Sequence, residues 1–259
     1  MYEFEFVKPA SLAEAVAALK AEDAKALGGG QTLIPTLKQR LAKPSRLVSL
    51  TGLAELVGIS EAGGILTVKG ATPHAEVTRV AAFPALAAMA AHIGDPAVRN
   101  RGTIGGSLAN NDPAADYPAA VLATGATIVT NAREIEADDF FQGLFTTALE
   151  EDEIITAVKF PIPEKANYQK FPQPASRFAL TGSFVAKYPS GVRVAVTGAS
   201  EQGVFRWSAA EAALTASFSP QALDALTVDP NGLIGDIHGS PEYRANLVKV
   251  LTKRAVQAA

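Results

Sequence analysis

The 259-residue sequence contains no cysteine. This absence excludes a disulfide, a cysteine-ligated zinc ion, an iron–sulfur cluster and a cysteine nucleophile within the chain. Histidine is also scarce. The three histidines, His74, His92 and His238, lie too far apart in sequence to form a local metal motif, and none is assigned a role. We therefore expect no metal site on this chain.

Long apolar runs are also missing. No stretch reaches the roughly 18 consecutive apolar residues that a membrane span needs. The amino-terminal MYEFEF lacks the basic-then-apolar layout of a signal peptide. The formal net charge is -3, with acidic and basic residues interspersed, and this argues against nucleic acid as a partner. We expect a soluble, cytoplasmic protein.

The chain has enough apolar residues to bury a sizeable core. Hydrophobic residues make up 48% and charged residues 19% of the sequence, and the length suits one large domain or two to three small ones. Helical spacing over 11–21 is followed by a short strand at 25–27, a helical turn after Pro35 and a second strand at 46–50, and together these predict a compact β-α-β unit. Ser11 and Glu14 form a candidate capping box for this helix.

The remaining sequence mixes strand and helix patterns. Pro161 and Pro163, with polar residues to about Lys170, indicate a boundary before a smaller α+β unit. The last helix is expected to begin at Ser240-Pro241. The other expected elements are strands at 65–68, 126–130, 154–160, 184–188, 192–197 and 204–207, and helices over 83–93 and from Ser208.

Two glycine-rich segments, Gly28–Thr32 and Thr103–Ser107, each follow an apolar stretch. Glycine lets the main chain approach a bulky group closely, and successive N–H groups in such a turn form an anion site. The structural alternative for the first segment is a flexible turn. Two such segments together indicate a nucleotide held between two pieces of chain.

Neither familiar nucleotide fingerprint fits. A Rossmann G-x-G-x-x-G motif fails at the first segment because Leu33 occupies the third glycine position. The second segment, with Gly102, Gly105 and Gly106, also fails the pattern, and no P-loop is present.

A polar stretch, Asn110 to Asp116, continues the second glycine segment. It could be a solvated loop with ordinary Asx turns. Asp112 and Asp116 could also form an acid–base pair for hydrolysis. We disfavour that interpretation because no partner histidine lies nearby in sequence.

The segment Leu27–Pro35, followed by Lys38 and Arg40, resembles the first FAD-binding motif of molybdenum hydroxylase flavoprotein subunits. Arg101–Ser107, continued to Asp112–Asp116, resembles the second. The chain resembles medium subunits of the aerobic carbon monoxide dehydrogenase type, which are related to the flavin domain of xanthine dehydrogenase. The resemblance runs nearly end to end and includes the residues 140–143, 153–155, 242–244 and 251–252.

This resemblance implies an α+β fold. It consists of a two-subdomain FAD-binding domain of the p-cresol methylhydroxylase/vanillyl-alcohol oxidase type and a smaller carboxy-terminal α+β domain. The subdomains are expected at 1–55 and 56–168, and the carboxy-terminal domain at 169–259.

The resemblance also implies the FAD contacts. The first segment should cradle the pyrophosphate through its main chain, with Leu27, Gly28, Gly29, Gly30, Gln31, Thr32 and Leu33. Thr103, Gly106 and Ser107 should complete the phosphate and ribityl contacts. Asp116 should accept hydrogen bonds from the ribityl hydroxyls, with Asn110 and Asp112 as further contacts. Lys170 is expected near the flavin ring, where a cation stabilises reduced, anionic flavin.

The implied function is an FAD-binding electron-transfer subunit. A molybdenum–pterin large subunit would oxidise the substrate, and an iron–sulfur small subunit would pass electrons to this chain. The chain would deliver them to NAD, oxygen or a quinone, within a heterotrimer or a dimer of heterotrimers. Two alternatives stay open: a stand-alone FAD-dependent oxidase or dehydrogenase, and a non-catalytic nucleotide-binding or assembly protein.

Overall fold

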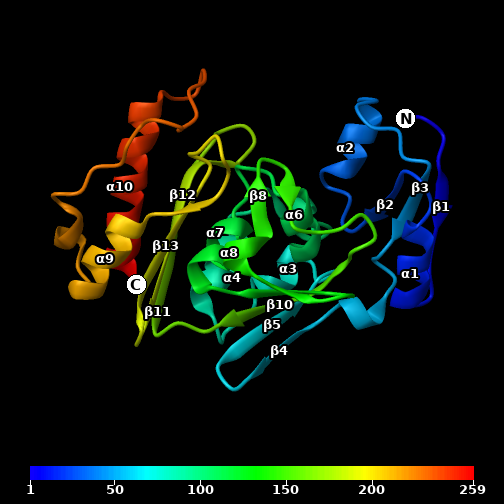
Figure 1. Ribbon diagram of the computed structural model, residues 1–259, viewed down its shortest axis with the longest axis horizontal. Coiled ribbons are helices and arrows are strands. Elements are labelled where there is room, and N and C mark those ends of the chain that lie inside the picture. Colours follow the sequence, from blue (N-terminus) through cyan, green and yellow to red (C-terminus); the bar gives the residue numbers. More distant parts are fainter.

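A computed structural model describes residues 1–259. Three units, each built around its own sheet, follow one another along the long axis of the molecule (Figure 1). The amino-terminal unit lies at one end, and the carboxy-terminal helix α10 (Pro241–Ala258) lies at the other. None of the helices combines the length and the apolar character needed to cross a membrane.

The amino-terminal unit contains the predicted β-α-β arrangement. Its parallel sheet has the order β1 (Glu5–Val7), β3 (Arg46–Ser49), β2 (Ala24–Leu27). The helices are α1 (Leu12–Leu19) and α2 (Leu33–Lys38). Ser11 Oγ accepts from Glu14 N at 3.2 Å, and the Glu14 carboxylate accepts from Ala10 N at 2.8 Å. The capping box is thus formed, with its return bond one residue earlier than in the standard motif.

The middle unit contains an antiparallel five-stranded sheet. Its order is β4 (Ile59–Ala62), β5 (Ile65–Lys69), β10 (Ile155–Pro161), β6 (Thr127–Thr130), β7 (Glu134–Glu136). A small hairpin joins β8 (Phe141–Gly143) to β9 (Thr146–Thr147). The helical elements are η1 (Ala54–Leu56), α3 (His74–Val77), α4 (Pro84–Ala91), α5 (Pro96–Arg99), α6 (Ile104–Asn110), α7 (Tyr117–Thr124) and α8 (Ala137–Phe140).

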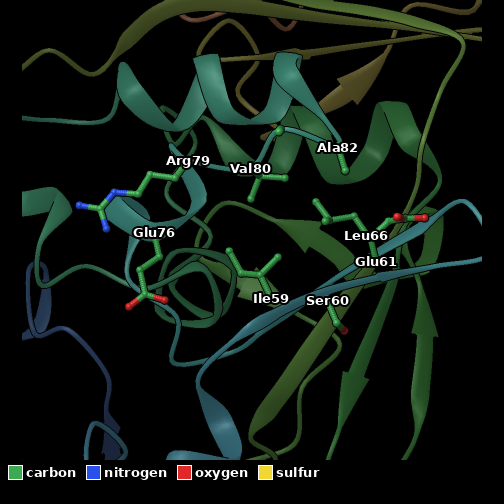
Figure 2. Close-up of a pocket in the computed structure, with 9 residues that line it drawn as sticks. Ile59, Ser60, Glu61, Leu66, Glu76, Arg79, Val80 and Ala82 are labelled. Atoms are coloured by element: carbon green, nitrogen blue, oxygen red, sulfur yellow. The ribbon is translucent and has the colours of Figure 1, made fainter.

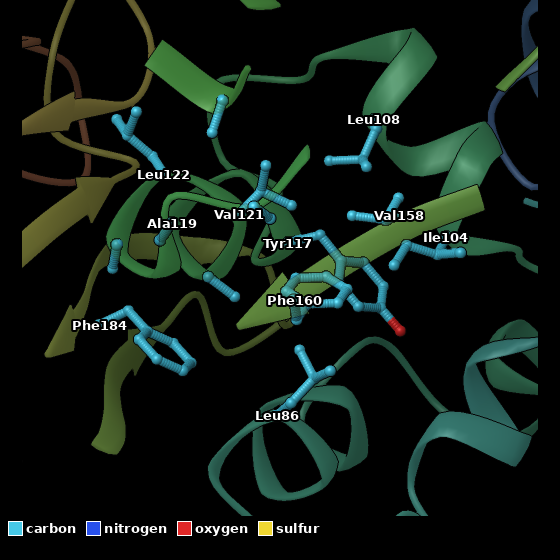
Figure 3. Close-up of a cluster of buried hydrophobic side chains, with 14 of the residues drawn as sticks. Leu86, Ile104, Leu108, Tyr117, Ala119, Val121, Leu122, Val158, Phe160 and Phe184 are labelled. Atoms are coloured by element: carbon cyan, nitrogen blue, oxygen red, sulfur yellow. The ribbon is translucent and has the colours of Figure 1, made fainter. Parts of the chain in front are cut away.

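Helix α7 lies at the centre of the largest core. All eight of its residues are buried, as expected for a helix that is apolar on every face. Figure 3 shows Tyr117 of α7 beside Phe160 of the middle sheet, with Phe184 of the carboxy-terminal unit in the same cluster. The middle and carboxy-terminal units therefore share one hydrophobic core.

The carboxy-terminal unit is a four-stranded antiparallel sheet. Its order is β11 (Lys165–Pro172), β12 (Ala179–Tyr188), β13 (Gly191–Thr197), β14 (Phe205–Arg206). Helices α9 (Ser208–Ala216) and α10 pack against it, as does α7, and η2 (Pro220–Leu223) contacts both α9 and α10. Figure 1 shows α9 and α10 on the outer side of this sheet.

The boundary before this unit differs from the sequence-based expectation. Pro161, Pro163 and the polar residues to about Lys170 were expected to mark a boundary, with the division after residue 168, whereas β11 begins at Lys165. A division after residue 168 would cut β11, whose Tyr168 pairs with Phe184 of β12. The sheet pairing therefore places the start of the carboxy-terminal unit before Lys165.

Candidate functional site

A cleft of about 610 Å³ lies where the amino-terminal and middle units meet. Both glycine-rich segments line it, together with the polar stretch that follows the second. The predicted site residues in its wall are Leu27, Gly28, Gly29, Gly30, Gln31, Thr32, Leu33, Thr103, Gly106, Ser107, Asn110, Asp112 and Asp116. Lys170 is not part of this wall. Residues from two stretches far apart in the sequence, 27–33 and 103–116, thus converge on one cleft.

The first glycine segment offers a row of main-chain donors. The five consecutive N–H groups from Gly28 to Thr32 donate no hydrogen bond to any protein acceptor. Gly30 adopts φ 72°, and this turn leads the chain directly into α2. Unpaired N–H groups at such a turn form a concave site for an anion.

The second glycine segment is organised differently. Four of its five N–H groups are already used, among them Gly105 N, which donates to Gly70 O at 2.9 Å, and Ser107 N, which donates to Thr103 O at 3.0 Å. Gly106 N donates to Thr103 Oγ1 at 3.2 Å, which caps α6. The second segment therefore offers fewer free N–H groups to a phosphate than the first. The second segment can contact a ligand through its side chains, and its glycines let the ligand approach the main chain closely.

The two segments are in direct contact. A β-carbon built on Gly29 would lie 2.0 Å from the carbonyl oxygen of Arg101 and 2.6 Å from the α-carbon of Gly102. Only glycine allows this approach. The N–H groups of the first segment are thereby held beside the side chains of the second.

Uncommitted polar side chains complete this part of the wall. The side chains of Ser107 and Asn110 make no hydrogen bond within the protein. Asp112 Oδ1 accepts from Ala114 N at 2.9 Å in an Asx turn, and partial burial raises the pKa of this carboxyl group. Such hydroxyl, amide and carboxylate groups can pair with sugar hydroxyls.

Asp116 lies at the start of α7 and is almost completely buried. Its Oδ2 is 2.9 Å from Lys170 Nζ, and its Oδ1 accepts from the hydroxyl of Tyr168. Burial raises the pKa of Asp116, while Lys170 and Tyr168 oppose that shift. The Lys170 charge is thus compensated by Asp116 within the protein, and neither residue is a free acid–base group for hydrolysis.

The sequence did not identify His74 as a cleft residue. His74 is 4% exposed, and its ring lies 5.2 Å from that of Tyr117, centre to centre. Neither His74 Nδ1 nor the Tyr117 hydroxyl has a hydrogen-bond partner. Burial, with a smaller contribution from the Arg99 charge, lowers the pKa of His74 to about 4. The imidazole is therefore neutral near pH 7, and only the tertiary fold brings it to the cleft.

Glu153 is a second cleft residue that the sequence did not assign to the site. It forms a two-point ion pair with Arg133, at 2.9 Å and 3.0 Å, and also accepts from Thr130 Oγ1 and Glu150 N. Hydrogen bonding to Arg133 is the main reason that the pKa of Glu153 falls to about 2. These bonds occupy the carboxylate, which supports the wall beside β10.

A second hollow, of about 520 Å³, lies between β4, β5 and the segment from α3 to α4. Figure 2 shows the apolar side chains of Ile59, Leu66 and Val80 turned toward it, with Glu76 and Arg79 at one end. It contains neither glycine segment nor any predicted site residue. No group of histidine, aspartate or glutamate side chains in the protein could hold a metal ion.

The main cleft fits a dinucleotide in volume and in chemistry. Ligand pockets commonly measure about 300–1,000 Å³, a range that includes this one. Free main-chain donors suit a pyrophosphate, and the hydroxyl and carboxylate groups across the cleft suit ribose or ribityl hydroxyls. The residues present are therefore compatible with FAD.

Comparisons with known proteins agree with this chemistry. The family model described as the FAD binding domain in molybdopterin dehydrogenase matches residues 2–163. The chain is 36% identical to the nicotine 6-hydroxylase medium subunit of Paenarthrobacter nicotinovorans, covering 97% of this chain and 95% of that protein. It is 33% identical to the carbon monoxide dehydrogenase medium chain of Afipia carboxidovorans, covering 99% and 96%.

Solved structures extend the likeness to the complete fold. A chain of carbon monoxide dehydrogenase from Hydrogenophaga pseudoflava matches with a TM-score of 0.89 at 34% identity, covering 100% of this chain and 97% of that one. A chain of quinoline 2-oxidoreductase from Pseudomonas putida 86 gives a TM-score of 0.89 at 31% identity, with the same coverage. The mixed α+β fold expected from the sequence is confirmed. The chain belongs to the FAD-binding family of the molybdopterin dehydrogenases and is of the medium-subunit type, with FAD as its cofactor.

Proposed function

We propose that this chain is the electron-transfer flavoprotein subunit of a three-subunit molybdenum hydroxylase. The row of unpaired N–H groups from Gly28 to Thr32, held against the second glycine segment, carries this proposal. Two relatives are named as a medium subunit and a medium chain, which supports an assembly with a larger and a smaller partner. The partners we propose are a molybdenum–pterin large subunit and an iron–sulfur small subunit.

The absence of cysteine is consistent with iron–sulfur clusters on a partner subunit. Iron–sulfur clusters need thiolate ligands, and this chain has none. Electrons would therefore arrive from clusters on the small subunit and leave to an external acceptor. Bound FAD supplies the redox chemistry, because a flavin accepts and donates electrons one or two at a time.

The chain's own residues bind and orient the cofactor. We assign the pyrophosphate to the main chain of Gly28–Thr32, flanked by Leu27 and Leu33. The ribityl and ribose hydroxyls are assigned to the side chains of Thr103, Ser107, Asn110, Asp112 and Asp116, with Gly106 giving close approach. Lys170 acts through Asp116, because its ammonium group is ion-paired there.

The finer architecture that we propose is a two-subdomain FAD-binding domain of the p-cresol methylhydroxylase/vanillyl-alcohol oxidase type. Two separate sheets on either side of the cleft support it. The subdomains are 1–55 and 56 to about 164, and a carboxy-terminal domain occupies the remainder. We propose that the chain acts in the cytoplasm, in a heterotrimer or a dimer of heterotrimers.

Purification of the untagged protein from its source tests the function. We expect a yellow complex with FAD bound to this chain and with iron and molybdenum on co-purifying subunits. A colourless monomer would overturn the proposal and favour a nucleotide-binding or assembly protein. Bleaching of the flavin by an organic substrate in the isolated chain would instead indicate a stand-alone oxidase.

A further inference from the structure

The polar loop of the cofactor cleft is held in place by the carboxy-terminal sheet. Thr197 Oγ1, at the end of β13, donates to Pro113 O at 3.0 Å and to Ala115 O at 2.7 Å. Gly198 N donates to Pro113 O at 2.8 Å, and Ala179 N donates to Ala114 O at 3.3 Å. Each carbonyl from Pro113 to Ala115 therefore has a partner on β12 or at the end of β13.

The side chain of Asp116, which follows this loop, is held by the same sheet. Tyr168 and Lys170 lie two residues apart on β11, so their side chains project from the same face of the sheet. Tyr168 donates its hydroxyl hydrogen to Asp116 Oδ1, and Lys170 Nζ lies 2.9 Å from Asp116 Oδ2. Lys170 Nζ also donates to His92 O at 3.2 Å. Both carboxylate oxygens thus have a fixed partner.

Gly182 on β12 makes room for this arrangement. It pairs with Lys170 in the register of β11 and β12. A β-carbon at position 182 would lie 2.2 Å from the hydroxyl oxygen of Tyr168 and 2.8 Å from its Cζ atom. The absence of a side chain there lets the Tyr168 ring lie across β12 and reach Asp116.

We infer that Tyr168 and Lys170 are positioning residues that orient the Asp116 carboxylate toward a sugar hydroxyl of the bound dinucleotide. This inference rests on the proposed function, and it makes the carboxy-terminal unit a required part of the cofactor site. Each carboxylate oxygen has two lone-pair directions. Tyr168 and Lys170 use one on each oxygen, which leaves the others for a ligand, and Asp116 is a lining residue of the cleft. Lys170 also compensates a charge that burial would otherwise disfavour.

The test is a mutational cycle on the complete protein in its complex, depleted of FAD and titrated with FAD. Tyr168→Phe removes one hydroxyl and keeps the ring. We expect the FAD dissociation constant to rise about tenfold, as for a hydrogen bond to a charged group. The same substitution is then made in the double variant Asp116→Ala/Lys170→Met, which lacks the carboxylate and leaves no unpaired buried ammonium group. In this background Tyr168→Phe should change the FAD dissociation constant by less than about twofold.

Tyr188→Phe is the matched control. Its hydroxyl donates to Pro161 O at 2.8 Å and lies outside the cleft wall, so the FAD dissociation constant should stay unchanged. If Tyr168→Phe binds FAD with wild-type affinity, the inference is overturned and the proposed function is unaffected. An equal loss in the background without Asp116 would also overturn the inference, because Tyr168 would then act by another route. A wild-type protein that binds no FAD would overturn the proposed function, and the inference with it.

Discussion

Gly29 and Arg101 approach so closely that a β-carbon on Gly29 would lie 2.0 Å from the Arg101 carbonyl oxygen. Gly29 belongs to the amino-terminal unit and Arg101 to the middle unit. Their contact fixes the spacing between the main-chain donors of one unit and the polar side chains of the other. The site thus depends on a packing contact as well as on its ligand-binding groups.

Gly29→Ala should separate the two glycine segments. Overlap with a carbonyl oxygen must be relieved by main-chain movement, and we expect a loss of about 1–3 kcal/mol in the free energy of unfolding. FAD content of the purified protein should fall more than about tenfold, because main-chain donors and side chains no longer match one ligand. Flavin absorbance per protein and urea unfolding measure the two effects.

Gly52→Ala is the control for this prediction. A β-carbon on Gly52 meets no atom within 4 Å, and its φ lies outside the left-handed range. FAD content should therefore match the wild-type value. A Gly29→Ala protein with full flavin content would show that the contact between the segments does not govern binding.

Ser107→Ala should affect the ligand and leave the fold intact. The Ser107 hydroxyl has no partner within the protein, so the free energy of unfolding of the FAD-free protein should change by less than about 0.5 kcal/mol. FAD affinity should fall roughly threefold to tenfold, the value of one neutral hydrogen bond. Equilibrium titration checks this, and unaltered affinity would remove Ser107 from the proposed contacts.

His74 should make stability fall in moderately acidic solution. Its pKa is about 4 when folded, against 6.5 for the ordinary group. Between these values the unfolded chain binds more protons than the folded one, so stability rises with pH from about 4 to 6.5. Over this pH range His74 should change the free energy of unfolding by about 3 kcal/mol.

His74→Gln should lose this contribution, and chemical denaturation at pH 4, 5, 6 and 7 compares the two proteins. We expect the difference between the two free energies of unfolding to change by up to about 3 kcal/mol between pH 6.5 and pH 4, because only the wild-type protein loses stability through His74. Parallel curves would contradict the prediction.

Glu153 should also make stability fall as the solution becomes more acidic, but in a lower pH range than His74. Its pKa is about 2 when folded and 4.5 ordinarily. The stabilisation is therefore complete above about pH 4.5 and disappears as pH falls toward 2. Allowing for the half-exposed Arg133 partner, it amounts to roughly 2 kcal/mol. Glu153→Gln should flatten acid unfolding followed by circular dichroism over this range, and an unchanged acid transition would exclude the ion pair as its source.

Local signals predicted much of the fold. Ser11 and Ser240 were expected to begin helices, and their hydroxyls do accept from Glu14 N and Tyr243 N. These predictions succeeded because capping and helical periodicity depend on residues close in sequence. The two glycine segments were likewise recognisable, since each is a run of consecutive residues that can be identified without the structure.

Other features depend on contacts between distant residues. Helix α7 was not predicted, because a helix buried on every face has no periodic polar stripe. Strand β11 was not predicted, since Lys165, Asn167 and Gln169 give it a polar composition that resembles a domain boundary. The pairing of Asp116 with Tyr168 and Lys170 spans more than 50 residues in the chain. Only the folded sheet reveals it.

The shared core around α7 has a consequence for how the protein opens. The middle and carboxy-terminal units are joined through 27 buried residues, whereas the amino-terminal sheet rests on a separate cluster of eight. The smaller block should therefore open first in local unfolding, with amide protons in β1, β2 and β3 exchanging before those of α7. Such an opening would carry the Gly28–Thr32 donors away from the rest of the cleft. The rate of cofactor dissociation would then be set by local unfolding of the small amino-terminal sheet, while the middle and carboxy-terminal units stay folded.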